Sequence, residues 1–242
     1  MKKHILWLTS IIFATLSLGC DPEDKKPIDR KPTTKKKVKA PPAKRVQVGK
    51  NIYLEVQGKR RRVFVNSVVC MRRGVLELLL TKAKTKEHEA ILAADVDARK
   101  LHQALLVAGF KPGSPVQFEP KYKVASGDRI KVTLMYEKEK GKIVTVPAQQ
   151  WILDKKKKPL DQQWVYGGSN LVPNPLDEKK PIFLANEGDL VCISNFESAL
   201  LDLPVKISKA NDELFYQCNT EAIPPMGTKV TVVFSLEKDK TK

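Results

Sequence analysis

The chain is long and strongly basic, with 242 residues and a formal net charge of +17 from 44 Lys and Arg against 27 Asp and Glu. Hydrophobic residues make up 42% of it, enough for a sizeable core, and its four cysteines are too few for a disulfide scaffold. The sequence contains no apolar run of the roughly 18 residues that a membrane-spanning helix needs.

Residues 1–19 have the pattern of a secretory signal peptide: a basic start, a short apolar stretch and a small residue. The stretch ends in Gly19-Cys20 and resembles the lipobox of bacterial lipoproteins. In that family the cysteine thiol receives a diacylglycerol and the chain is cut before it, so the resemblance implies lipidation of Cys20. Asp21 resembles a signal for retention in the inner membrane. The alternative is an ordinary signal peptide that happens to end near a cysteine.

Residues 20–50 are predicted to be a disordered, basic tether. Positions 21–50 hold eleven Lys or Arg, four acids and five prolines, a net charge of +7. Such a segment cannot bury enough apolar surface to fold, and it could span about 90 Å when extended or roughly 30 Å as a coil. The lysines of 35–39 could lie on anionic lipid headgroups. Nucleic acid is not an expected partner, because no aromatic residues interleave the lysines.

From residue 51 onward the pattern changes to alternating apolar and polar residues, which predicts strands. One helix is predicted over 97–108, where Asp97 can cap the start and Gly109 and Pro112 end it. The predicted strands are 52–56, 62–69, 74–80, 88–93, 129–137, 142–146, 150–153, 164–166, 182–185, 190–194, 214–217 and 228–236.

The order of these elements predicts the fold class. The strands follow one another closely, and no repeated helix separates them as a parallel sheet would require. We therefore expect residues 51–242 to form a single compact α+β domain, mainly antiparallel, with one clear helix, after the disordered tether.

Several short motifs, in this order, resemble the YdjY-domain family of bacterial envelope proteins. They are Lys86–Ala90, Leu101–Gly113, Trp164–Ser169, Glu187–Val191, Ile193–Phe196, Asp202–Pro204, Asn219-Thr220 and Ile223–Thr228. Together they span roughly residues 50–236, and the chain looks like a planctomycete-type lipoprotein with one such domain. The resemblance implies no established reaction. Some members have been labelled ferredoxin-like, but an iron–sulfur cluster needs four closely grouped cysteines, which this chain lacks. No cofactor is predicted.

His88 and His102 are the only histidines after the signal peptide, and they are the candidates for metal binding or proton transfer. Glu87 and Glu89 flank His88, although on a strand these carboxylates would point to the opposite face. A structural role for both histidines is the competing interpretation, and the sequence has no H-E-x-x-H motif.

Three cysteines remain besides Cys20, all in apolar strand contexts: Cys70, Cys192 and Cys218. An odd number allows at most one disulfide, and Cys192 with Cys218 is the candidate pair in an oxidising compartment. Buried free thiols are the alternative. Thiol chemistry is the weakest functional hypothesis.

The remaining motifs have simple structural explanations. Ser169 lies outside a hydrolase G-x-S-x-G elbow and is predicted to lie in a turn. Glu187 and Asp189 could supply carboxylates to calcium but lack the spacing of a calcium loop. The lysine run Lys155–Lys158 predicts a solvated loop. Four aromatic residues could line a cleft, but aromatics on strands are usually core: Trp151, Trp164, Tyr166 and Phe183.

These observations lead to two functional hypotheses. The first is a non-catalytic lipoprotein that faces the periplasm or the cell exterior and binds or organises another envelope protein or polymer. The alternative is an envelope enzyme that uses His88 and His102 with carboxylates such as Glu89, and in one version a metal. The sequence contains no complete catalytic constellation, which favours the first.

Overall fold

The computed structural model describes residues 43–205 and 216–236. The predicted signal peptide 1–19, the candidate lipidation site Cys20, Asp21 and the tether up to residue 42 lie outside the described residues. So does the first half of the strand predicted over 214–217.

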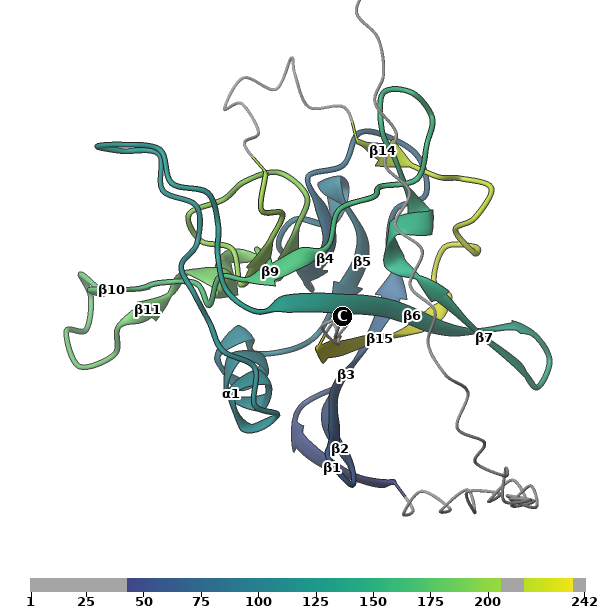
Figure 1. The fold of residues 1–242 in the computed structure, drawn as a ribbon, viewed down its shortest axis with the longest axis horizontal. Helices are drawn as coiled ribbons and strands as arrows, with labels where there is room; N and C mark the ends of the chain where they lie inside the picture. The colour runs from purple at the N-terminus through teal and green to yellow at the C-terminus, as the bar shows by residue number, and fades with distance from the viewer. Residues whose placement is uncertain (1–42, 206–215, 237–242) are drawn as a thin grey trace, which may run out of the picture. The chain divides into compact units, whose positions relative to one another are not determined.

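The described part of the chain is built mainly of strands, with one α-helix, α1 (Ala98–Val107) (Figure 1). Three short 3-10 helices accompany them: η1 (Glu87–Glu89), η2 (Ala148–Trp151) and η3 (Leu184–Glu187). The strands are β1 (Lys44–Gly49), β2 (Ile52–Gln57), β3 (Arg60–Val69), β4 (Leu78–Lys82), β5 (Ala90–Ala94), β6 (Arg129–Glu139), β7 (Lys142–Pro147), β8 (Ile152–Leu153), β9 (Trp164–Tyr166), β10 (Leu171–Val172), β11 (Ile182–Phe183), β12 (Val191–Cys192), β13 (Leu201–Asp202), β14 (Gln217–Cys218) and β15 (Lys229–Leu236).

Eight of these strands close into a barrel. Their order around the ring is β3, β15, β6, β9, β13, β12, β4 and β5, and β5 pairs back onto β3. Most neighbours are antiparallel, but β4 with β5 and β12 with β13 are parallel. The prediction of an α+β fold was therefore wrong, because the single helix accompanies a closed barrel and does not form a layer of its own.

The sequence could not predict this closure for a physical reason. The ring depends on β12 and β13, which have two residues each, and on the short pairing of β3 with β5. Segments this short have no measurable hydrophobic period, so no pattern indicates that they pair. The longer strands β2, β3, β6, β7, β9 and β15 all lie where alternation predicts strands.

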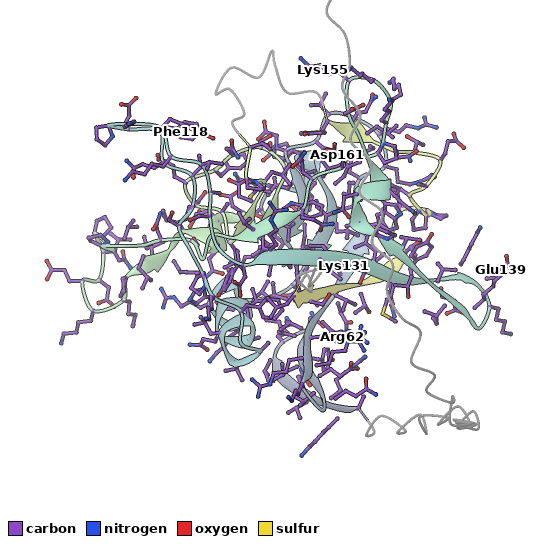
Figure 2. All side chains as sticks on the ribbon, in the orientation of Figure 1. Arg62, Phe118, Lys131, Glu139, Lys155 and Asp161 are labelled. Atoms are coloured by element: carbon purple, nitrogen blue, oxygen red, sulfur yellow. The ribbon has the colours of Figure 1, made fainter. Side chains whose placement is uncertain are left out.

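Apolar side chains fill the barrel (Figure 2). Alternate residues of β3, β6 and β15 point inward, and an eight-stranded barrel is just wide enough for side chains to fill it. Trp164 and Tyr166 of β9 belong to the same core, which confirms that these aromatic residues are buried. The inward residues of the three long strands are Val63, Val65, Ile130, Val132, Leu134, Val230, Val232 and Phe234.

Two hairpins extend beyond the ring (Figure 1). β1 and β2 continue the sheet from β3, and β7 pairs with the far half of β6. Residues 44–49, which the sequence analysis assigns to the end of the tether, form β1. Residues 44–49 bury little apolar surface, but the hydrogen bonds between β1 and β2 hold them in a regular strand.

Helix α1 begins and ends where its sequence predicts. The Asp97 carboxylate accepts a hydrogen bond from the Arg99 amide at 2.8 Å, which caps the first turn. Gly109 follows the helix with φ of +89°, a conformation that favours glycine. The helix packs against β1, β2 and η3, and its buried residues join the barrel core.

Candidate functional site

The two candidate histidines lie in different environments. His88 is in η1, its side chain is 78% exposed, and its Nε2 is 3.8 Å from Glu89 Oε2. His102 lies on α1, half-buried between the rings of Tyr166 and Phe183. No hydrogen bond, ion pair or ring contact in the described part of the chain joins the two histidines or gives them a common partner.

The surroundings of His102 are those of a structural histidine. Its Nδ1 is 2.8 Å from the Tyr166 hydroxyl, which also donates to the His102 carbonyl oxygen at 3.2 Å. Burial lowers the pKa of the His102 imidazole, so the ring is neutral at pH 7. The contacts tie α1 to strand β9. Within the described residues no group of three His, Cys, Asp or Glu side chains has the geometry to hold a metal ion.

The carboxylate motifs meet in a partly buried polar cluster on the outside of the barrel. Lys86 Nζ is 2.8 Å from Asp189 Oδ1, and the Ser198 hydroxyl donates to the other oxygen of Asp189. Glu89 Oε1 is 3.9 Å from the Lys86 ammonium, which also lies 4.5 Å from the ring centroid of Phe196. Asp189 is therefore occupied by an internal ion pair, whereas a calcium site would need its oxygens free.

The electrostatics of this cluster confirm that it is held together internally. Burial opposes the charge of Lys86, but the hydrogen bond and charge of Asp189 outweigh it and raise the pKa of the ammonium. Burial and the Glu89 carboxylate raise the pKa of Glu77. Gly188 permits the close packing, because a Cβ there would lie 2.7 Å from Thr85 Oγ1 and its φ is +131°.

Asp202 lies close to this cluster and is a buried carboxyl. It sits on β13, opposite Val165 of β9, and is fully buried. Its Oδ1 accepts hydrogen bonds from the Leu203 amide and from Asn195, while Oδ2 has no hydrogen-bond partner among the described residues. Burial raises the pKa of the Asp202 carboxyl to about 7. The sequence gives no signal for this, since only the burial of β13 makes the residue unusual.

The three cysteines are free thiols, and the candidate disulfide is not formed. Cys192 packs outside the barrel with Leu78 and Ala90, while Cys218 belongs to the main core. Burial raises the pKa of Cys70 to about 11 and that of Cys218 to about 12. It also raises the pKa of Cys192 well above its usual value. Protonated buried thiols are poor nucleophiles, which argues against thiol chemistry.

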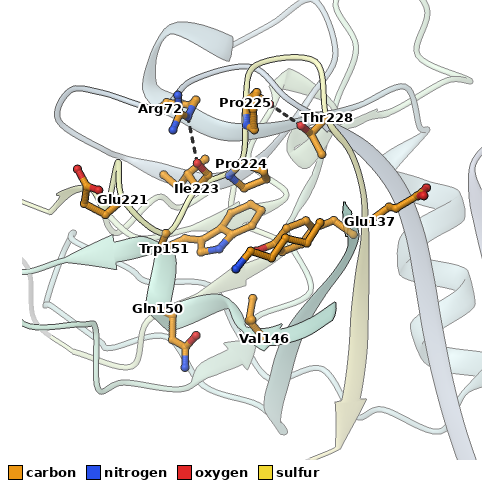
Figure 3. Close-up of a pocket in the computed structure, with 13 residues that line it drawn as sticks. Arg72, Glu137, Val146, Gln150, Trp151, Glu221, Ile223, Pro224, Pro225 and Thr228 are labelled. Atoms are coloured by element: carbon orange, nitrogen blue, oxygen red, sulfur yellow. Dashed lines mark hydrogen bonds between the residues drawn. The ribbon is translucent and has the colours of Figure 1, made fainter. Parts of the chain in front are cut away.

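A groove of about 680 Å³ opens between η2, the end of β6 and the loop that precedes β15 (Figure 3). Tyr136 packs against the buried Trp151 at its base, with ring centroids 5.5 Å apart. The walls combine apolar and charged residues: Arg72, Glu137, Lys138, Val146, Gln150, Glu221, Ala222, Ile223, Pro224, Pro225 and Thr228. The volume lies within the range of ligand sites in proteins, and the lining is more polar than that of most small-molecule pockets.

Hydrogen bonds hold the groove's loop, residues 219–228, at several points. Arg72 donates from Nε to the Ile223 carbonyl at 3.1 Å and from Nη2 to the Thr220 carbonyl at 3.0 Å. The Asn219 amide donates to Trp151 and the Gly227 amide to Val69, each at 2.9 Å. The groove is therefore formed before any ligand binds.

The family model for the YdjY domain matches residues 54–235. The chain belongs to the YdjY-domain family. The match runs from β2 to the end of β15 and confirms the resemblance seen in the sequence motifs. In this YdjY-domain protein two of those motifs, Asn219-Thr220 and Ile223–Thr228, form the loop of the groove, while four others supply the polar cluster around Asp189 and Asp202.

Comparison with curated proteins and with solved structures gives no match. Within residues 43–205 and 216–236, no helix is long and apolar enough to cross a membrane.

Sequence reasoning missed most of the groove. Arg72 and Tyr136 come from strands or loops more than 60 residues apart, and no local pattern joins them. The consecutive prolines Pro224 and Pro225 are a local signal for this loop, since their rings restrict the backbone.

Proposed function

We propose that this YdjY-domain protein is an exported lipoprotein, acylated at Cys20, whose barrel binds another envelope component in the groove of Figure 3. The basic start, the apolar stretch and Gly19-Cys20 support export and acylation. Asp21 favours the inner membrane. The protein would then face the periplasm or the cell exterior, at the end of a basic, proline-rich tether.

The observation that carries the binding proposal is the preformed groove. Its loop is fixed by Arg72 and by backbone hydrogen bonds at both ends, so little conformational entropy is lost when a partner binds. Pro224 and Pro225 restrict the loop further.

The chemistry of the groove fits a partner with both apolar and polar groups. Tyr136 and the two prolines offer apolar surface, while Glu137, Lys138 and Glu221 place charges of both signs at the rim. A protein segment or a polymer strand lying along the groove could use both kinds of contact.

Acylation is tested directly on Cys20. We expect the wild-type chain, expressed in bacteria supplied with labelled palmitate, to take up label and to fractionate with membranes. The Cys20→Ser variant should lose both properties while it is still exported. Equal labelling of both proteins would contradict the anchor.

Binding in the groove is tested by site-specific photo-crosslinking in living cells. A photoreactive amino acid at the exposed position Lys138 should yield a discrete crosslinked product, and the same residue at the exposed loop position Lys156 should not. The product should disappear when Ala222→Trp fills the groove. A product that persists in Ala222→Trp, or that forms equally from position 156, would contradict the proposal.

A further inference from the structure

We propose that the basic end of the barrel docks on the anionic phospholipid surface to which the chain is tethered. This end is defined by the turn between β2 and β3, the start of β6 and the last residues of β15. The inference rests on the proposed function in one respect: acylation of Cys20 would hold the domain at the membrane on which it docks. It concerns a different surface from the groove of Figure 3.

A groove of about 660 Å³ at this end is lined by cations. Four of its seven lining residues are basic and none is acidic: Lys59, Arg60, Arg61, Ala108, Lys131, Ser235 and Leu236. The four basic residues are all exposed. Positive charge concentrated along one concave surface attracts anions, and lipid headgroups supply phosphate groups at high density.

These cations are not neutralised within the described part of the chain, where no ion pair involves any of the four. The nearest acid on the hairpin, Glu55, is paired with Arg45 and Arg62 instead.

The end of helix α1 helps to place Arg61. A Cβ built on Gly109 would lie 3.8 Å from Arg61 Nη1, so the guanidinium lies close to the last turn of the helix. Carbonyl groups at a helix C-terminus favour a nearby cation. These carbonyl groups carry only partial charges, so they do not cancel the full positive charge of Arg61.

The tether enters the folded domain at this same end. Lys44 is the first residue of β1 and lies opposite Val56 of β2. Val56 in turn lies opposite Arg61 of β3. Only 22 residues separate Cys20 from Ala43 in the sequence. An acylated Cys20 would therefore keep the basic end close to the bilayer, where short-range electrostatic attraction acts.

Leu236 favours a lipid surface over nucleic acid as the occupant. It lies in the groove with 42% of its surface exposed, which suits the boundary between headgroups and acyl chains. None of the groove's lining residues, all within the described chain, is an aromatic that could stack on bases.

The test is co-sedimentation with lipid vesicles, using the processed chain of residues 20–242 with Cys20→Ser, so that acylation plays no part. Vesicles of phosphatidylcholine alone are compared with vesicles that also contain phosphatidylglycerol. The double variant Arg61→Glu with Lys131→Glu is compared with Lys156→Glu with Lys158→Glu, which changes the charge equally on a loop far from the basic end (Figure 2).

We expect the wild-type chain to bind the anionic vesicles, less tightly as salt is added, and not the neutral ones. The basic-end variant should bind at least about tenfold more weakly, and the loop variant within about twofold of wild type. No preference for anionic vesicles would overturn the proposal. So would an equal loss in both variants, or displacement by inorganic phosphate at constant ionic strength, which would indicate a site for a free anion. Because this chain carries no lipid, each result is independent of the palmitate test on Cys20.

Discussion

Two groups of cations on the neighbouring strands β1, β2 and β3 have opposite surroundings. Arg45 and Arg62 converge on the buried Glu55 carboxylate and lie over the ring of Phe64, with Arg45 3.9 Å from its centroid. Lys59, Arg60 and Arg61, a few residues away at the turn, have no acidic partner in the described chain. The first group uses its charge inside the fold, and the second keeps it available to an outside partner.

The comparison extends to the polar cluster outside the barrel. There Lys86 and Asp189 neutralise each other, while Asp202 has no cation beside it and stays protonated more readily. The effect of each charge on stability should therefore follow its burial and its partner. Four predictions test this ordering, from the largest effect to the smallest.

Asp189→Asn should lower the free energy of unfolding by about 3–5 kcal/mol, because it removes the buried anion 2.8 Å from the half-buried Lys86 and leaves that ammonium with the more distant Glu89. Chemical denaturation measures this. The control is Asp177→Asn, which removes a partner of Lys180 from an exposed ion pair and should change stability by less than about 1 kcal/mol. Equal effects of the two substitutions would show that burial does not decide the strength of these pairs.

Asp202 should make the fold less stable as pH rises. Its pKa is about 7 in the folded chain against a usual value of 3.8, so the folded state binds the proton more tightly. The free energy of unfolding should therefore fall by about 4 kcal/mol between about pH 4 and pH 7 and stay level above that.

Comparison with Asp202→Asn isolates this slope, because it cancels the contributions of other groups. Among these is His102, whose lowered pKa acts in the opposite direction by destabilising the fold as pH falls below about 6.5. If wild type and variant show the same pH dependence in denaturant unfolding, then folding does not raise the pKa of the Asp202 carboxyl, and the account of this residue is wrong.

Glu55→Gln should destabilise the domain by about 1–3 kcal/mol, less than Asp189→Asn, because Arg45 is half exposed and water can replace its partner. The hydrogen bonds from Arg62 and Arg45 overcome the effect of burial and hold the pKa of Glu55 below its usual value. Its part of the stability should accordingly disappear as pH falls through the acidic range. Denaturation of wild type and variant at neutral and acidic pH measures both effects.

Arg61→Glu with Lys131→Glu should lower the free energy of unfolding by less than about 1 kcal/mol, since both side chains are exposed, form no ion pair in the described chain, and lose only the favourable position of Arg61 near the C-terminus of α1. Thermal or chemical unfolding beside wild type is sufficient. A large loss would mean that these cations serve the fold, and it would remove the contrast with Arg45 and Arg62.

The sequence predicted the parts of this molecule that have a local signal. Asp97, the apolar stripe and Gly109 define α1, and alternation finds the long strands. The sequence did not predict the closed barrel, because β12 and β13 are two residues long and pair with partners distant in sequence. The groove and the burial of Asp202 could not be predicted for the same reason, since both depend on contacts between segments that are distant in the sequence.

The family resemblance carried more information than any single candidate residue. His88 and His102 were candidates because of their chemistry, and the structure gives them separate, simple environments. Six of the eight motifs of the resemblance form the groove loop or the polar cluster. Their order along the chain could indicate the family, but not that distant motifs would lie together.

The most direct test of the contrast between the two groups of cations is hydrogen exchange of the processed, unacylated chain with and without anionic vesicles. We predict slower exchange at the amides of the β2–β3 turn, around Gly58 and Lys59, when vesicles are present, and unchanged exchange in the groove loop 219–228. An unchanged turn, or protection confined to the groove loop, would contradict the account.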